Sequence, residues 1–325
     1  MTRKVIFNVP WISIPLLKKY LKTDWEIIPF NPQWKNGIDL DDEIIAYVGF
    51  KPSKDLLKSI KGLKYHITQS AGYEWADEEF YRKQGIILIN SHANAVSVAE
   101  HAIALFFALM KDIVNSDRLV RERKGIWLPL KENMVMTWGA RNKKALIFGT
   151  GAIGKEIAKR LKAFEMKIIG IKRKKQHVEY FDEIYTLNEF KKVLGTVDAI
   201  FIAIPLSNET KNLLKKEEME LIKETAFIIN VARAQIIDEE ALYNALKERL
   251  IGGAGLDVHY VLPWETTNGD KIMYHFPFHE LNNVILTPYR AWYSDDTVIS
   301  TAKDIAYKLD CIATGKEIPD VVIHP

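Results

Sequence analysis

Short apolar runs alternate with helical patterns along two stretches of the chain. The first stretch contains "KVIFNV", "EIIAYVGF", "LKYHITQ" and "GIILIN", separated by helical patterns such as "SKDLLKSI" and "ADEEFYRKQ". The second begins at Lys144 and contains "KALIFG", "KIIGI", "AIFIAIP", "AFIINV", "IGGAGLDV" and "NVILTP", with "GKEIAKRLKAF" and "DEEALYNALKER" between them. Strands that alternate with helices predict βαβ units, and runs of Val, Ile, Ala and Phe are typical of parallel strands covered on both faces. We therefore predict an α/β fold with two doubly wound parallel sheets.

Two longer helices are predicted outside these units. The segment "SVAEHAIALFFALMKDIVNSDRLVRERKG" begins with Ser97 and has Glu100 three residues later, a capping-box pattern that predicts a helix start. Its early turns are too apolar to face water, so we expect this helix to pack between subunits or domains. The tail "DDTVISTAKDIAYKLDCIATG" has the pattern of one amphipathic helix that ends at Gly315.

Composition narrows the class of protein. A length of 325 residues fits two domains, and 48% hydrophobic with 27% charged residues is ordinary for a globular protein. The net charge of +3 is too small to favour nucleic acid or an anionic membrane, so we expect a small-molecule partner. The single cysteine, Cys311, excludes an internal disulfide and fits a reducing compartment. We expect it to be a packed residue of the C-terminal helix.

No segment has the pattern of a targeting or membrane sequence. The apolar residues near the start are interrupted by Asn8, Pro10 and Pro15, and no small-residue cleavage site follows. The longest apolar stretch, residues 102–110, is far shorter than the roughly 20 residues that a membrane helix needs. We therefore expect a cytoplasmic protein without a membrane span.

A glycine-rich turn carries the strongest local signal. In "ALIFGTGAIGKEIAKRL", Gly149, Gly151 and Gly154 have GxGxxG spacing between a predicted strand and a predicted helix, and Ala152 and Ile153 lie in the same turn. The first glycine permits a sharp turn, the second lets backbone approach a pyrophosphate, and the third lets helix and strand pack closely. A structural glycine turn is the alternative, but the strand and helix around the motif favour a dinucleotide site.

The next strand ends in a basic loop where an acidic residue would be expected. Dinucleotide-binding folds place Asp or Glu about 20 residues after the glycines to bind the adenosine ribose. Here the chain reads "GIKRKK", with Lys172, Arg173 and Lys174. Positive charge at this place favours the 2′-phosphate of NADP, with NAD still possible, and the alternative is a solvated surface loop. We predict no metal site.

Motifs along nearly the whole chain resemble the D-isomer-specific 2-hydroxyacid dehydrogenase family. They are "QSAGYEWAD", "ANAVSVAEH", the glycine motif, "IPLSNETKNLL", "INVARAQIIDEEAL" and "GGAGLDV". The family includes glyoxylate and hydroxypyruvate reductases, phosphoglycerate dehydrogenase and formate dehydrogenase. The resemblance implies a Rossmann NAD(P)-binding domain over residues 95–291. It also implies a flavodoxin-like substrate domain, the lid, built from residues 1–94 and 292–325.

The resemblance also assigns roles to individual residues. Arg233 matches the arginine that grips the substrate, and it follows an apolar strand at the end where open α/β sheets bind ligands. A surface arginine at a helix start is the alternative. Ser70, Ala71 and Gly72 match the loop whose amides hold the substrate carboxylate. Asn94 sits where formate dehydrogenases use an asparagine, although asparagine is common there throughout the family.

Further positions match the cofactor cleft of the family. Asp257 matches the acid near the nicotinamide carboxamide, and a turn residue at a strand end is the alternative for it. The cleft is lined in the family at the positions of Pro205, Val231 and Ala232. A homodimer through the helix of residues 97–113 is also implied.

The catalytic pair of the family is missing. Members normally use a histidine as proton donor, paired with a glutamate. The chain has Tyr289 at the histidine position, in "ILTPYRAW", and Leu262 at the glutamate position, in "GLDVHYVLP". The two changes make sense together, because a buried glutamate without its imidazole would be an unpaired charge. A protein that has lost activity could drift to the same pair.

Tyr289 is our candidate proton donor. A phenol with an ordinary pKa near ~10 can donate a proton to a carbonyl oxygen as hydride arrives, but it is a poor base near neutrality. We therefore expect a reductase that favours 2-oxo acids over 2-hydroxy acids. Other acids lie nearby in sequence, and each is expected to be a surface or packing residue: His259, Glu265, His275 and His279.

Three functions stay open. The leading hypothesis is hydride transfer between NADP(H) and a small 2-oxo or 2-hydroxy acid. The second is a non-catalytic dinucleotide-binding sensor or scaffold on the same fold, because fold alone does not fix function. Formate oxidation is third. It needs no proton donor, so it would tolerate the loss of the histidine. In the family, however, this reaction depends on a histidine and glutamine pair that is absent here.

Overall fold

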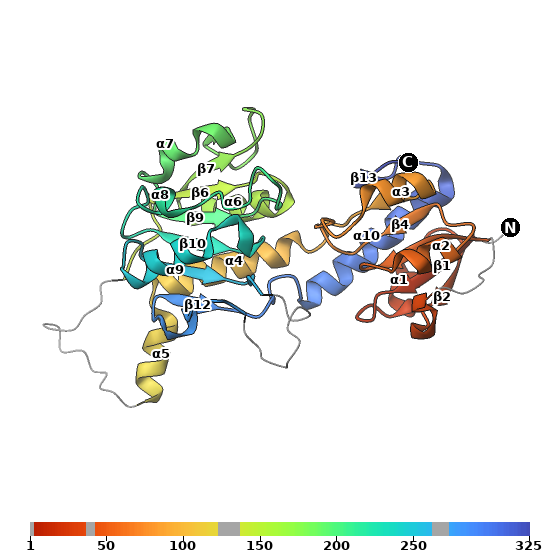
Figure 1. The fold of residues 1–325 in the computed structure, drawn as a ribbon, viewed down its shortest axis with the longest axis horizontal. Coiled ribbons are helices and arrows are strands. Elements are labelled where there is room, and N and C mark those ends of the chain that lie inside the picture. Colours follow the sequence, from red (N-terminus) through yellow and green to blue (C-terminus); the bar gives the residue numbers. More distant parts are fainter. Residues whose placement is uncertain (1–2, 37–42, 123–136, 262–272) are drawn as a thin grey trace, which may run out of the picture. The chain divides into compact units, whose positions relative to one another are not determined.

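The computed structural model describes residues 3–36, 43–122, 137–261 and 273–325. By its internal contacts the chain divides into two compact units (Figure 1). Unit 1 contains residues 1–94 and 293–325, and unit 2 contains residues 95–292. Leu262 and Glu265 lie outside the described residues.

Unit 1 is built on a six-stranded sheet in the order β13-β5-β4-β3-β1-β2. Five of these strands are parallel, and β13 joins one edge antiparallel to β5. The order 2-1-3-4-5 is that of flavodoxin-like doubly wound folds. The strands are β1 (Arg3–Asn8), β2 (Trp25–Pro29), β3 (Ile44–Gly49), β4 (Tyr65–Ile67), β5 (Ile87–Ile89) and β13 (Val321–Ile323). The helices are α1 (Ile14–Tyr20), α2 (Lys54–Ser59), α3 (Glu78–Gln84) and α10 (Asp295–Thr314).

The C-terminal helix α10 completes unit 1. Its predicted end is confirmed, because Gly315 takes the left-handed conformation (φ 66°) in which glycine carries no steric cost. At its start Ser294 accepts a hydrogen bond from the amide of Thr297 at 3.2 Å. Its buried face includes Cys311, a free thiol. The fully buried Lys308 bonds to Asp304 and to backbone within the same unit.

Unit 2 is built on a seven-stranded parallel sheet in the order β12-β11-β10-β9-β6-β7-β8. Strands β9, β10 and β11 are buried throughout, and β6 and β7 are buried after their first residue, as the apolar runs predict. The strands are β6 (Lys144–Phe148), β7 (Lys167–Ile171), β8 (Glu183–Tyr185), β9 (Ala199–Ile202), β10 (Phe227–Asn230), β11 (Gly253–Leu256) and β12 (Val284–Leu286). The helices are α4 (Ala95–Met110), α5 (Ile113–Arg121), α6 (Ala152–Ala163), α7 (Lys191–Leu194), α8 (Lys216–Met219) and α9 (Glu239–Lys247).

The long helix after residue 94 differs from the prediction in two ways. It begins at Ala95, so the capping-box prediction is wrong: Ser97 lies inside the first turn and donates a hydrogen bond to the carbonyl of Ala291 at 2.9 Å. Glu100 instead pairs with Arg160. The helix is also broken at Asp112, which has a positive φ of 50° and separates α4 from α5. The buried face of α4 packs against α6, β10 and β11 of its own unit.

Among the described residues, no helix combines the length and the apolar character that crossing a lipid bilayer requires.

Candidate functional site

The predicted site residues of unit 2 lie in loops at one edge of its sheet. Because the strands are parallel, their carboxyl ends meet at the same edge. The sheet order changes direction at β6, whose neighbours are β9 and β7, and ligands bind open α/β sheets at such a switch point. The loops are residues 149–154 after β6, 172–174 after β7, 203–205 after β9, 231–233 after β10, 257–259 after β11 and 287–290 after β12.

The glycine loop has the shape that a pyrophosphate needs. Gly149 has φ +96°, and a Cβ there would lie 2.3 Å from the carbonyl oxygen of Ala203. A Cβ on Gly154 would lie 1.9 Å from the carbonyl oxygen of Gly149, so neither position tolerates a side chain. A Cβ on Gly151 would meet no atom within 4 Å, and α6 begins there without a side-chain cap. The first-turn amides of α6, from Ala152 onward, are therefore oriented for an anion.

The basic loop after β7 exposes two positive side chains. Lys172 is half-buried, and its amide donates to the carbonyl of Tyr185 at 3.0 Å, which fixes the start of the loop. Arg173 and Lys174 are exposed. The loop therefore presents a guanidinium and an ammonium group at the carboxyl edge of the sheet.

Backbone contacts shape the loops after β9 and β10. The hydroxyl of Thr210 donates to the carbonyl of Pro205 at 2.8 Å. Asn230 is 1% exposed and donates to the carbonyl of Arg233 at 2.9 Å while accepting from the amide of Ala232 at 3.1 Å. Val231, which follows Asn230 in the turn, is buried. Asn230 therefore holds the turn from which the half-buried Arg233 side chain extends.

The carboxylate of Asp257 ties the end of β11 to the turn after β12. It accepts hydrogen bonds from the Thr287 hydroxyl at 2.6 Å and from the amides of Arg290 at 2.8 Å and Ala291 at 2.9 Å. His101 Nε2 lies 3.4 Å from the same carboxylate. Burial acts to raise the pKa of Asp257, but these hydrogen bonds, led by the one from His101, outweigh burial and hold the pKa below its ordinary value. The carboxylate is therefore an anion that positions the turn, and a contact with nicotinamide stays a prediction.

Tyr289 lies in that turn. It has a positive φ of 56°, uncommon for a residue other than glycine, and its amide donates to the carbonyl of Thr287 at 3.1 Å. Its half-buried ring packs edge-to-face against the ring of His259, with centroids 5.5 Å apart and an interplanar angle of 67°. The candidate donor is therefore held by both its backbone and its ring.

His259 was expected from the sequence to be a surface or packing residue, and the structure places its ring against the ring of Tyr289. It is 2% exposed, and its Nδ1 lies 2.8 Å from the hydroxyl of Tyr274. Burial lowers the pKa of His259, while Asp257 acts in the opposite direction. Burial raises the pKa of Tyr274, which keeps that phenol protonated. Of the other acids considered nearby, His275 pairs with Glu239 on the surface.

The predicted substrate loop lies in unit 1, after β4. The hydroxyl of Ser70 donates to the carbonyl of Gly72 at 2.8 Å, and the amide side chain of Asn90 donates to the carbonyl of Ala71 at 2.7 Å. These bonds fix the loop at the carboxyl ends of β4 and β5. Within the described residues, three amide oxygens of unit 1 are buried without a hydrogen-bond partner, those of Gln69, Asn90 and Asn94.

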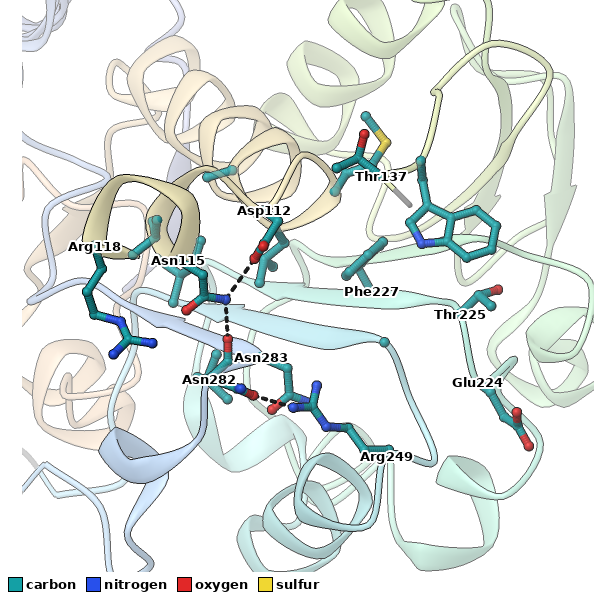
Figure 2. Close-up of a pocket in the computed structure, with 18 of the residues that line it drawn as sticks. Asp112, Asn115, Arg118, Thr137, Glu224, Thr225, Phe227, Arg249, Asn282 and Asn283 are labelled. Carbon is teal, nitrogen blue, oxygen red and sulfur yellow. Dashed lines mark hydrogen bonds between the residues drawn. The ribbon is translucent and has the colours of Figure 1, made fainter. Parts of the chain in front are cut away.

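A separate cavity of about 520 Å³ lies at the opposite edge of the sheet of unit 2 (Figure 2). Phe227, Gly252 and Asn283 line it close to where β10, β11 and β12 begin. On the side of α5, Asn115 donates to the side chain of Asp112 and to the carbonyl of Asn282. Because the glycine loop and Arg233 lie at the carboxyl edge, this cavity is not the predicted cofactor site.

Comparisons with known proteins agree with this geometry. The profile described as D-isomer specific 2-hydroxyacid dehydrogenase, NAD binding domain, matches residues 103–291. The chain belongs to this family. A glyoxylate reductase of Thermococcus litoralis is 32% identical over 97% of this chain and 94% of its own length.

Two solved structures share the dehydrogenase fold. An acyclic imino acid reductase in complex with NADPH and D-Arg has a TM-score of 0.79 and 26% identity, covering 98% of this chain and 100% of its own. An NADPH-dependent glyoxylate/hydroxypyruvate reductase of Sinorhizobium meliloti, in complex with NADP and malonate, has a TM-score of 0.76 and 22% identity, covering 99% and 97%.

Membership of the dehydrogenase family confirms four predictions: the family itself, the two-domain α/β fold class, an NAD(P)-binding domain and an oxidoreductase type of protein. Sequence reasoning missed the residues that hold the site in shape. They are Asn230, Thr287, Tyr274 and His101. Asn230 and His101 lie inside motifs quoted for the resemblance, but the supporting role of all four residues is recognised only from their contacts.

Proposed function

We propose that this dehydrogenase-family chain reduces a small 2-oxo acid with NADPH and that the reverse oxidation is slow. One observation carries the proposal: the glycine loop, Arg233 and Tyr289 follow strands of one parallel sheet and lie at the same edge of it. Arg233 supplies a planar fork suited to a carboxylate, and its charge stabilises an oxygen that becomes negative as hydride arrives. The glyoxylate reductase relative supports the substrate class.

The preference for NADPH rests on the basic loop. Arg173 and Lys174 are exposed directly after β7, in the place where an acidic residue would otherwise bind the ribose hydroxyls. A 2′-phosphate would meet a guanidinium and an ammonium group there. The two solved structures described above contain NADPH or NADP.

Each residue then has one task. The bound cofactor supplies a hydride to C2 of the acid. The residues that would hold it are the glycine loop, the basic loop, Pro205, Val231 and Ala232, with Asp257 near the nicotinamide. Arg233 binds the carboxylate. In unit 1 the loop of Ser70, Ala71, Gly72 and Asn94 keeps the carboxylate-binding role that the family resemblance implies for it. Tyr289 donates its phenolic proton to the carbonyl oxygen, and its high ordinary pKa makes it a poor base for the reverse reaction.

A second candidate reaction is the reduction of a 2-imino acid. An iminium group already carries the proton that a carbonyl oxygen must receive, so its reduction does not need the histidine and glutamate pair that the family normally uses. The acyclic imino acid reductase supports this reaction class. So do the buried oxygens of Gln69, Asn90 and Asn94 in unit 1, because unpaired acceptors suit a substrate that has N–H donors. A non-catalytic sensor is the third candidate.

One set of measurements separates these candidates. NADPH and NADH binding is measured by calorimetry, and cofactor oxidation is then followed with glyoxylate, hydroxypyruvate, pyruvate and larger 2-oxo acids, with and without added methylamine. Oxidation with the acid alone supports the 2-oxo acid reductase. Oxidation that requires the amine replaces it with imino acid reduction. Tight NADPH binding without turnover of 2-oxo acids or 2-imino acids supports the non-catalytic sensor.

We also propose that the protein is a homodimer and that it works in the cytoplasm. The helix first predicted to form the dimer, residues 97–113, buries its apolar face within unit 2, so we propose α5 as the dimer surface instead. Ile113, Val114 and Val120 on α5 are exposed beside the cavity at the amino edge of the sheet and offer an apolar surface to a second copy. A free buried Cys311 fits a reducing compartment. Sedimentation at twice the chain mass of 37.4 kDa would support the dimer, and sedimentation at that mass would reject it.

A further inference from the structure

The contact between His259 and Tyr289 is set by strand register. β11 and β12 pair in parallel with Leu256 beside Leu286, and each ring belongs to the residue three positions beyond that pair. The carboxylate of Asp257 then fixes the turn of Tyr289 against the end of β11. The edge-to-face contact at 5.5 Å therefore follows from the backbone arrangement.

His259 uses only one of its two ring nitrogens. Its Nδ1 meets the Tyr274 hydroxyl. Its Nε2 is buried and makes no hydrogen bond of standard geometry within the described residues, while the carbonyl of Thr287 lies near enough to the ring to favour its protonated form. A buried polar group without a partner costs on the order of 1–3 kcal/mol. A phenylalanine would fill the same space without that cost, so packing alone does not account for an imidazole here.

We propose that His259 is the proton source for Tyr289, an inference that rests on the proposed reductase function. As hydride from NADPH forms the new C–H bond at C2, the electron pair of the C=O bond moves to oxygen and takes the phenolic proton of Tyr289. The N–H bond at Nε2 of the protonated His259 breaks in turn, and its proton restores the phenol. The products are the 2-hydroxy acid, NADP⁺ and a neutral imidazole, which takes its next proton from water.

The surroundings of His259 suit this exchange. Burial favours the neutral ring and lowers its pKa, while the nearby carboxylate of Asp257 and the carbonyl of Thr287 favour the protonated ring. Burial makes the protonated ring release its proton readily, and Asp257 and Thr287 favour the return of a proton to the ring. The titratable groups around the ring and its direct neighbours are Asp257, Tyr274, Tyr289, Glu239 and His101. In this position His259 is a positioning residue that acts through Tyr289.

The kinetic test compares His259→Phe with a control, His279→Phe, whose imidazole is 76% exposed. In His259→Phe we expect kcat for 2-oxo acid reduction to fall by roughly 30-fold or more, in the range of general acid catalysis, with NADPH affinity kept within about 2-fold. The fall of wild-type kcat with rising pH, at a midpoint below the ordinary histidine value, should disappear in His259→Phe and persist in the control. Full kcat with an unchanged pH profile overturns the proposal.

A second test needs no turnover. The ring resonances of labelled histidines are titrated by NMR in the full-length wild type and in Tyr289→Phe, with NADPH and oxamate bound, and His259 is identified as the signal that Tyr274→Phe displaces. If the two rings exchange a proton, Tyr289→Phe shifts the midpoint of His259 by about 0.5 units or more and leaves His279 unchanged. An unchanged midpoint overturns the pairing. Failure of the wild type to reduce any 2-oxo acid instead overturns the proposed function, so the two failures are distinguishable.

Discussion

Replacing Asp257 with asparagine should loosen the turn that carries Tyr289. The Asp257 carboxylate accepts one hydroxyl and two amide hydrogen bonds, and an asparagine can replace only one of the two oxygens. If the side-chain oxygen of the asparagine keeps the bonds from Thr287 and Arg290, its NH₂ group faces the amide of Ala291. Both groups are then donors, and no hydrogen bond forms between them. An unsatisfied buried amide and the loss of charge from the remaining bonds together cost about 3 kcal/mol.

This cost should appear as a lower melting temperature. For a unit of this size, 1 kcal/mol corresponds to roughly 2–4 °C, so Asp257→Asn should melt about 6–12 °C below wild type at pH 7, as followed by near-UV circular dichroism. A matched control is Asp117→Asn, which removes an exposed ion pair with Arg121 on α5 and should leave the melting temperature nearly unchanged. Equal melting temperatures for Asp257→Asn and wild type would refute the role assigned to the carboxylate.

The same difference should depend on pH. Because the pKa of Asp257 is lowered in the folded protein, its stabilisation is present above the unfolded carboxyl pKa of about 3.9 and is lost as pH falls through the lower folded value. The gap between wild type and Asp257→Asn should therefore be constant near neutrality and narrow below about pH 4. A gap that is unchanged in acid would show that the carboxylate charge does not contribute.

Three further predictions concern the cofactor loops and unit 1. Arg173→Ala should raise the KM for NADPH about 10-fold or more while leaving that for NADH nearly unchanged, and an equal effect on both would reject the phosphate contact. Gly154→Ala should abolish NADPH binding measured by calorimetry, because its Cβ would collide with the carbonyl of Gly149; retained binding would contradict the close approach. Burial lowers the pKa of His66 to about 4, so wild-type stability should fall by about 3 kcal/mol as pH drops from about 6.5 to 4. His66→Phe should flatten that pH dependence in urea unfolding, and an undiminished slope would exclude His66 as its source.

The fold was largely accessible from the sequence because buried parallel strands have a strong signature. The apolar runs quoted for both sheets fall on strands, and Gly315 marks the end of α10. The missed strands β2, β8 and β13 are five, three and three residues long, and all three lie at a sheet edge where one neighbour is absent. The capping-box error at Ser97 has another cause: a buried hydroxyl inside a helix can bond to a distant carbonyl, which local spacing cannot reveal.

Some residues of the candidate site were predicted from the sequence, and others were not. The glycine loop was predicted from the sequence because its first and third glycines answer local steric demands, which the close approaches at Gly149 and Gly154 show. Arg233 was readable because it directly follows a strand. The roles of the residues that hold these side chains in place were not predicted. Asn230 acts through two hydrogen bonds to the backbone of its own turn, and these are seen only once the turn is folded. Thr287 acts through a hydrogen bond to the side chain of Asp257, 30 residues away, and this contact depends on which strands are neighbours.

The predicted substitution of the family's catalytic histidine by Tyr289 has to be judged from two strands at once. From the sequence alone this substitution predicts weaker proton transfer, because a phenol is a weaker acid than a protonated imidazole. Across the sheet, β11 and β12 end together, and an imidazole stands three residues beyond one end while the phenol stands three residues beyond the other. A chain that had merely lost its catalytic pair would have no reason to bury an imidazole with an unpaired nitrogen against the replacement. Burial of that imidazole, together with the carboxylate of Asp257 that fixes the turn, favours a working proton path at this site over an inactive one.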